Sequence, residues 1–282
     1  MTYGKISGFS DEIDSNIVAQ FETLNRLNIK YFEPRGINGK NISTLNDKEV
    51  NELKEKMEIY KIKASSIGSP IGKIYVEDDF EEHFETFKKV VKIAKELETK
   101  YIRIFSFYTK DGEWTTEKRN EVFNKLKTMI AYAKENDIVL LHENEKDIYG
   151  DTVDRCADLM DNLYCDNFKA VFDPANFVQS KQDTKYAYEK LGKYIEYMHI
   201  KDSMADGKVV PAGMGDGNIE YVLKKLFDKG YDGFISLEPH LGSFEGLAEL
   251  ELTDKMVNLP KSGEGTFTIA YNALNDILNK IL

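Results

Sequence analysis

The chain has 282 residues, of which 41% are hydrophobic and 31% charged, a composition typical of soluble globular proteins with a sizeable core. No apolar run approaches the roughly 18 residues of a membrane span, and the segment from Met1 to Lys5 has no apolar signal region. The net charge of −11 opposes non-specific nucleic-acid binding, which relies on Lys and Arg to neutralise phosphates. We therefore expect a cytoplasmic protein with a small-molecule partner, and neither a nucleic-acid nor a membrane partner.

Short β-branched or aromatic runs alternate with amphipathic helical stretches along the chain. Strands are expected near Lys5–Phe9, Lys30–Phe32, Lys63–Ile67, Tyr101–Phe105, Ile138–His142, Lys169–Phe172, Tyr197–Ile200 and Phe234–Leu237. Apolar residues recur at helical spacing in Ile17–Leu27, Val50–Met57, Phe80–Leu97, Val122–Ala133, Val153–Met160, Tyr186–Leu191, Ile219–Phe227 and Phe267–Leu278.

This alternation calls for parallel strands joined by right-handed helical crossovers. It fits either a closed (β/α)8 barrel or an open doubly wound sheet. Polar residues at the strand ends favour the barrel, because all strands of a barrel end at one mouth, whereas the end strands of an open sheet lie far apart. We therefore predict an α/β fold, a single (β/α)8 TIM barrel domain over residues 1–282.

Four predicted strands end in residue types that bind divalent metals. Glu143, Asp173, His199 and Glu238 follow apolar runs and lie 30, 26 and 39 residues apart, about one strand-helix unit each. Singly, each is equally well explained as a solvated carboxylate, a turn-forming Asp before Pro, or a rim histidine. Together they form an oxygen and nitrogen set that suits Mn²⁺, Co²⁺ or Mg²⁺ better than a thiolate-rich zinc site does. We predict a divalent metal, Mn²⁺ first, with Mg²⁺, Co²⁺ or Zn²⁺ as alternatives.

Glu143 and Glu238 close the fifth and eighth predicted strands, on opposite walls of the expected mouth. A shared cation would polarise a carbonyl and its neighbouring hydroxyl and so acidify the carbon-bound proton between them. One carboxylate can remove that proton and the other return it. This predicts a sugar isomerase or epimerase. The same abstraction followed by loss of a β-hydroxyl or a glycosidic group would give a lyase or dehydratase, and a non-catalytic sugar-binding barrel is a further alternative.

Other polar residues near the strand ends are candidates for contacts with sugar hydroxyls, although each also fits an ordinary surface role. They are Glu33, Arg35, Ser69, Lys73, Arg103, Ser106, His240 and, less strongly, Asn144 and Glu145. Lys201 is expected to neutralise an anionic group or a developing oxyanion near the metal, with Asp202 orienting it. His142 should point away from Glu143 by strand alternation, and His83 is expected to be a solvated helix residue.

Two loops invite functional interpretations. Pro211–Gly217 is rich in glycine but lacks the Lys-Ser/Thr ending of a P-loop, so a lid, or a turn capped by Asn218, is the alternative to a phosphate cradle. Phe107, Tyr108 and Trp114 follow the fourth predicted strand, where they either stack on a sugar or pack against the barrel. Cys156 and Cys165 are expected to be free thiols in a reducing cytosol.

Several motifs resemble the xylose-isomerase-like sugar phosphate isomerase/epimerase superfamily, which includes tagatose 3-epimerases, inosose dehydratases and apurinic endonuclease barrels. The resemblance runs from Gly8–Glu12 to the final helix. Its most specific parts are Phe32–Gly36, Ser69–Lys73, Asp173–Asn176, His199–Asp202 and Leu237–His240.

This resemblance implies that Glu143, Asp173, His199 and Glu238 are metal ligands, that the two Glu residues transfer protons, and that a homo-oligomer is possible. Asn176 stands where ketohexose epimerases usually have a His three residues after the metal Asp. This difference favours keto-glycosides, inososes or related sugar derivatives over free ketohexoses, with Asn176 itself near the substrate. A nuclease of the apurinic endonuclease type is disfavoured, because the chain has four histidines and a net charge of −11.

Overall fold

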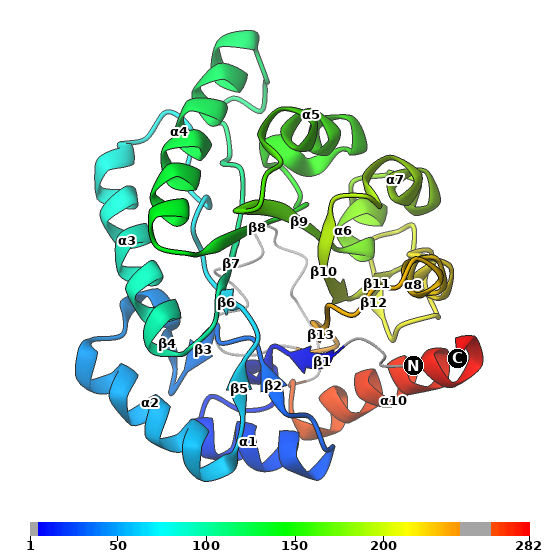
Figure 1. Ribbon diagram of the computed structural model, residues 1–282. Helices are drawn as coiled ribbons and strands as arrows, with labels where there is room; N and C mark the ends of the chain where they lie inside the picture. The colour runs from blue at the N-terminus through cyan, green and yellow to red at the C-terminus, as the bar shows by residue number, and fades with distance from the viewer. Residues whose placement is uncertain (1–4, 243–260) are drawn as a thin grey trace.

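Parallel strands form a ring, and the helices that connect them lie outside it (Figure 1). This computed structural model describes residues 5–242 and 261–282. The ring contains β1 (Lys5–Gly8), β2 (Tyr31–Phe32), β5 (Lys63–Ala64), β6 (Ile67–Gly68), β7 (Tyr101–Ile104), β8 (Val139–Glu143), β9 (Phe168–Phe172), β10 (Ile195–Ile200) and β13 (Phe234–Leu237). Seven of these strands form one sheet in the order β1-β13-β10-β9-β8-β7-β6, and β2 pairs with β5.

Backbone hydrogen bonds close the remaining gaps in the ring. The amide of Glu33 donates to the carbonyl of Gly8 over 2.9 Å and so joins β2 to β1. The amide of Gly68 donates to the carbonyl of Pro34 over 2.9 Å, which places β6 in line with β5. The predicted (β/α)8 barrel is therefore confirmed over the open sheet.

The third predicted strand, Lys63–Ile67, is interrupted in the structure. Its position in the ring is split into β5 and β6. The amide and the hydroxyl of Ser65 both donate to the carbonyl of Phe32, over 2.8 and 3.0 Å.

The helices that cover the ring follow the predicted apolar periodicity. They are α1 (Ile17–Arg26), α2 (Asp47–Tyr60), α3 (Phe80–Glu96), α4 (Thr116–Glu135), α5 (Val153–Leu163), α7 (Thr184–Leu191), α8 (Ile219–Asp228) and α10 (Glu264–Ile281). The short helix α6 (Pro174–Gln179) was not predicted. It begins with Pro at its first position, where the missing N–H costs nothing.

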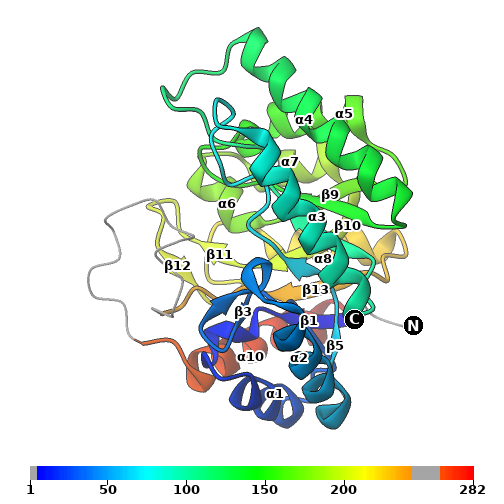
Figure 2. The same ribbon diagram turned by 90° about the vertical axis from the view of Figure 1, so that its left-hand side faces the viewer.

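Shorter elements lie around the mouth of the barrel. They are the hairpins β3 (Gly36–Ile37) with β4 (Lys40–Asn41) and β11 (Asp202–Ser203) with β12 (Val209–Val210), and the turns η1 (Ser10–Glu12), η2 (Ile42–Thr44) and η3 (Tyr149–Asp151). Figure 2 shows β11 and β12 on the side of the barrel opposite the C-terminus, where the strands end. Within the described residues, no helix combines the length and apolar composition needed to cross a bilayer.

The turn after β6 depends on a glycine and a histidine. Gly72 has a φ of +91°, and a Cβ added there would overlap the carbonyl of Phe105. Its amide donates to Nε2 of His83 on α3 over 2.8 Å. Burial, helped by Lys125, lowers the pKa of His83 to about 4, so the ring is neutral and can accept this bond. The prediction of a solvated His83 is therefore wrong, because the helix turns this residue toward the barrel.

We predict that Gly72→Ala lowers the free energy of unfolding by about 3 kcal/mol or more, because it adds backbone overlap to the usual penalty for a left-handed alanine. Gly112→Ala is the matched control, since Gly112 has a φ of +74° but nothing within 4 Å of an added Cβ. The control should cost about 1 kcal/mol. Urea unfolding of both variants measures the difference, and equal losses would show that the contact with Phe105 does not matter.

Candidate metal centre

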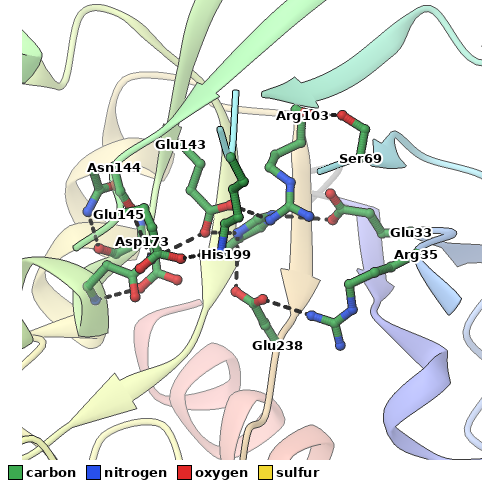
Figure 3. A network of polar contacts seen from close by, with 12 residues as sticks. Glu33, Arg35, Ser69, Arg103, Glu143, Asn144, Glu145, Asp173, His199 and Glu238 are labelled. Atoms are coloured by element: carbon green, nitrogen blue, oxygen red, sulfur yellow. Dashed lines mark hydrogen bonds and ion pairs between the residues drawn. The ribbon is translucent and has the colours of Figure 1, made fainter. Parts of the chain in front are cut away.

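Four neighbouring strands bring Glu143, Asp173, His199 and Glu238 to one point at the mouth. Glu143 ends β8, His199 lies in β10, and Asp173 and Glu238 directly follow β9 and β13. One ligand atom from each lies within 4.8 Å of all the others, and all four residues are buried. Figure 3 shows these side chains pointing toward one another. The structure thus brings together the whole predicted ligand set.

His199 lies at the centre of this cluster. Its Nδ1 atom is 2.9 Å from Oε1 of Glu143 and 3.5 Å from Oε2 of Glu238. Two cations neutralise part of the surrounding negative charge. Arg103 donates to Oε2 of Glu143 over 2.7 Å, while Nζ of Lys201 lies 2.9 Å from Oδ2 of Asp173 and 3.2 Å from Oε2 of Glu238.

These contacts decide the charge of each carboxyl group. Burial favours the neutral form of Glu143, but His199 and Arg103 outweigh it and hold the pKa at about 2. The pKa of Glu238 is likewise well below its usual range despite burial, because Lys201 and His240 lie beside it. Burial dominates at Asp173 and raises its pKa to about 7 against the opposing effect of Lys201. Glu143 and Glu238 are therefore carboxylates, the form that a metal ion or a proton acceptor requires.

The donor set fits a divalent cation. Three carboxylates and one imidazole nitrogen converge in a buried site, a combination that suits Mn²⁺, Mg²⁺, Co²⁺ or Zn²⁺. Neither cysteine belongs to this cluster. Cys156 is buried and donates to the carbonyl of Gly150 over 3.2 Å, and Cys165 is exposed; both are free thiols, as predicted.

Asn144 and Asn176 support the loop after β9. Asn144 exchanges two hydrogen bonds of 2.9 Å with the backbone of Asp173. The side-chain amide of Asn176 donates to the carbonyl of Asn144 over 2.9 Å and to Oε1 of Glu143 over 3.4 Å. The structure therefore places Asn176 beside a predicted ligand, where its amide orients the Glu143 carboxylate.

A second charged cluster adjoins Glu238. Arg35 donates to Asp11 over 2.8 and 3.1 Å, to Glu12 over 3.3 Å and to Oε1 of Glu238 over 3.1 Å. The His240 amide donates to Glu12 over 2.7 Å, and its ring nitrogen Nε2 lies 3.4 Å from Glu238. Arg35 and His240, both predicted site residues, thus contact a predicted ligand directly.

Sequence reasoning missed Asp11 and Glu12 as site residues. Both lie in η1, immediately beyond the first strand, and both are buried. One sequence feature could have identified them as site residues: they lie two and three residues after Phe9, the last residue of that predicted strand.

Other predicted residues have local partners. Lys73 pairs with Glu145 over 3.1 Å, and the Ser69 hydroxyl donates to the carbonyl of Arg103 over 2.6 Å. Ser106 accepts a hydrogen bond from the Gly150 amide over 2.8 Å. His142 packs against Phe168 of β9 and lines a small cavity beside α5, so it faces the helix layer as predicted.

The glycine loop binds a carboxylate of the chain itself. The amides of Gly213, Gly215 and Gly217 donate to the Asp202 side chain over 2.8, 3.0 and 2.9 Å. The phosphate-cradle interpretation is therefore not supported. Asp202 was expected to orient Lys201, but it holds this loop instead. Asn218 directly precedes α8, but its side chain makes no cap bond and instead donates to Thr184 over 2.8 Å.

The aromatic residues after β7 pack against the barrel. Phe107 is fully buried and lies edge-on to Phe80 of α3. Trp114 lies edge-on to Tyr149 with 5.2 Å between ring centroids, and Tyr108 is buried. These contacts favour packing over stacking on a sugar.

Residues 21–255 match the model of the xylose isomerase-like TIM barrel family. The chain belongs to this family. The match covers more than half of the chain and confirms the resemblance that the motifs indicated.

Proteins with a similar sequence or structure differ in the activity for which they are named. A 3-dehydroshikimate dehydratase of Bacillus anthracis is 24% identical over 162 residues, which span 57% of this chain and 56% of that protein. A D-tagatose 3-epimerase-like protein has a similar structure, with a TM-score of 0.75, 18% identity and coverage of 98% of both chains. The IOLI protein with a bound zinc atom also has a TM-score of 0.75, with 17% identity and coverage of 99% of both chains. At these identities the two structures show the common fold alone.

We predict that Asp173→Asn weakens divalent-metal binding by about 100-fold, a loss near 3 kcal/mol, because a buried ligand loses its charge. The fold should survive, because Oδ1 of Asp173 accepts from the Asn176 amide at the start of α6 and Asn can do the same. Asp183→Asn is the matched control, since Asp183 caps α7 through Tyr186 in the same way outside the cluster. Titration calorimetry with Mn²⁺ measures both variants, and an unchanged affinity for Asp173→Asn would remove Asp173 from the site.

Proposed function

We propose that this protein is a divalent-metal-dependent isomerase or epimerase of a sugar or sugar derivative, a keto-sugar or keto-glycoside, with Mn²⁺ as the first choice of metal. One observation carries the proposal: the carboxylates of Glu143 and Glu238 both face Nδ1 of His199, at 2.9 and 3.5 Å, from the ends of β8 and β13. Paired carboxylates around one cation are suited to moving a proton between carbon atoms or between faces of one carbon.

Glu143, Asp173, His199 and Glu238 would hold the cation, which would polarise a substrate carbonyl and its adjacent hydroxyl. Glu143 and Glu238 would remove and return the proton. The Arg103 guanidinium, 2.7 Å from Glu143, and the Lys201 ammonium, 3.2 Å from Glu238, lower the proton affinity of both groups. Both groups are therefore carboxylates before the reaction, which is the form that accepts a proton.

The charges around the mouth support an uncharged substrate. Arg103 and Lys201 face Glu143 and Asp173, and Arg35 faces Asp11. Because each of these cations already lies against a carboxylate, binding a phosphate or a carboxylate would require breaking an internal pair. A keto-sugar derivative with hydroxyl groups needs no such exchange.

A dehydratase is the second candidate. The similarity to a 3-dehydroshikimate dehydratase supports it, and the same proton abstraction begins both reactions. After abstraction, the carbon–oxygen bond of a β-hydroxyl would break, with the hydroxyl leaving as water once it is protonated by a carboxylic acid.

Reaction in deuterated water tests the proposal. With Mn²⁺ and a panel of keto-sugars and keto-glycosides, we expect solvent deuterium at the epimerised or isomerised carbon, because the carboxylate exchanges its proton with solvent. Glu143→Gln and Glu238→Gln should each lower turnover at least 100-fold, the scale of losing a general acid or base. Nuclear magnetic resonance and mass spectrometry of the products provide the readout.

Two outcomes would contradict the proposal. Product without solvent deuterium indicates a hydride shift instead of proton transfer by these carboxylates. Product that has lost one water assigns the dehydratase reaction. Asp183→Asn, which changes a helix cap outside the cluster, is the control for nonspecific loss of turnover.

A further inference from the structure

The two ring nitrogens of His199 face different groups. Nδ1 points at Glu143 and Glu238, as described above. Nε2 lies 3.3 Å from Oε2 of Glu33, and both side chains are completely buried. Nε2 makes no hydrogen bond within the described structure. If Nδ1 provides the lone pair for a metal ion, Nε2 carries the proton, and the Glu33 carboxylate faces it (Figure 3).

Aromatic neighbours restrict the orientation of the His199 ring. Phe9 lies edge-on to it, with 5.2 Å between centroids and 78° between planes. Tyr197 lies edge-on as well, at 5.7 Å and 87°. Rotation of the ring would collide with one of these residues, since close-packed interiors leave little free space. The ring is thus held with Nδ1 toward the cluster.

Glu33 is itself fixed by hydroxyl groups in the barrel interior. Its Oε2 atom accepts hydrogen bonds from Tyr197 over 3.0 Å and from Ser236 over 2.7 Å. The Tyr197 hydroxyl lies 2.9 Å from that of Ser65, which lies 2.6 Å from that of Ser7. Branched apolar side chains usually fill the interior of a TIM barrel. Here a hydrogen-bonded polar layer lies beneath His199, and burying it is tolerable only because its members bond to one another.

We propose that Glu33 is a positioning residue, which accepts a hydrogen bond from Nε2–H of His199 and so makes Nδ1 the ring nitrogen that faces a bound metal. A carboxylate partner of this kind fixes the tautomer and raises the basicity of a metal-binding histidine. The inference rests on the metal site of the proposed function. It gives Glu33 a different role from the sugar contact expected from its position after the second strand.

Glu33→Gln tests the role of the carboxylate. Metal affinity should fall about 10- to 100-fold, the usual loss when such an outer partner is changed. In the Zn²⁺-loaded protein, nitrogen-15 magnetic resonance should show His199 protonated at Nε2, and the resonance of this N–H group should shift in the variant because a neutral amide is a weaker acceptor than a carboxylate. The visible spectrum of the Co²⁺-loaded protein should change as well. These measurements are independent of turnover.

Ser236→Ala and Glu145→Gln complete the design. Ser236→Ala removes one hydrogen bond from Glu33 and keeps the carboxylate, so affinity should fall only about fivefold, the equivalent of ~1 kcal/mol. Glu145→Gln removes a carboxylate that pairs with Lys73 and does not contact His199. It should change metal affinity less than about twofold, as expected for a partner on the rim.

Three results would overturn the inference. An unchanged metal affinity and an unchanged Nε2–H resonance in Glu33→Gln would limit Glu33 to a structural role, even if the variant unfolds more easily. An equal loss in Glu145→Gln would indicate a general charge effect. If the wild-type protein binds no Mn²⁺ or Co²⁺, the metal site fails, and the proposed function fails with it. Wild-type binding that is unchanged in Glu33→Gln rejects only the role of Glu33.

Discussion

The concentration of buried carboxylates around His199 is the constraint on which the rest of this site depends. Glu33, Glu143, Asp173 and Glu238 all lie out of water, and such charges are costly unless each has a partner. Arg103, Lys201 and Arg35 are the partners of Glu143, Asp173 and Glu238, and they come from β7, from the end of β10 and from the loop after β2. Hydroxyl groups donate to Glu33. Positive residues at the mouth therefore serve first to balance charge, and only then to contact a substrate.

His199 connects the cluster at the mouth of the barrel with the hydroxyl layer in its interior. The cluster at the mouth gathers negative charge where a carbonyl compound would bind, while the hydroxyl layer below holds Glu33 against the far side of His199. A fold that many enzymes share can host different reactions because the mouth and the loops vary while the strands stay in place. Membership of the family consequently shows the fold, whereas the reaction and the substrate depend on the residues at the mouth.

Sequence reasoning located the barrel and all four residues of the central cluster, because strand ends and their spacing are local features that a barrel brings together. It failed where the direction of a side chain, or the identity of its partner, depends on tertiary packing. Glu33 follows a strand of only two residues, too short for alternation to show whether the side chain faces the mouth or the interior. Asp202 and the distant glycines form one unit, and His83 contacts Gly72. No local pattern could predict these partners.

The four residues of the cluster come from β8, β9, β10 and β13, which are consecutive neighbours in the sheet. A cation held by all of them would act as a cross-link across the second half of the ring. It would add its binding free energy to the folded state by mass action. None of the four residues comes from the first half of the ring, where β2 and β5 form a separate short pair. The cation would therefore not cross-link that half. Loss of metal would therefore make the second half of the ring easier to open and leave the first half unchanged.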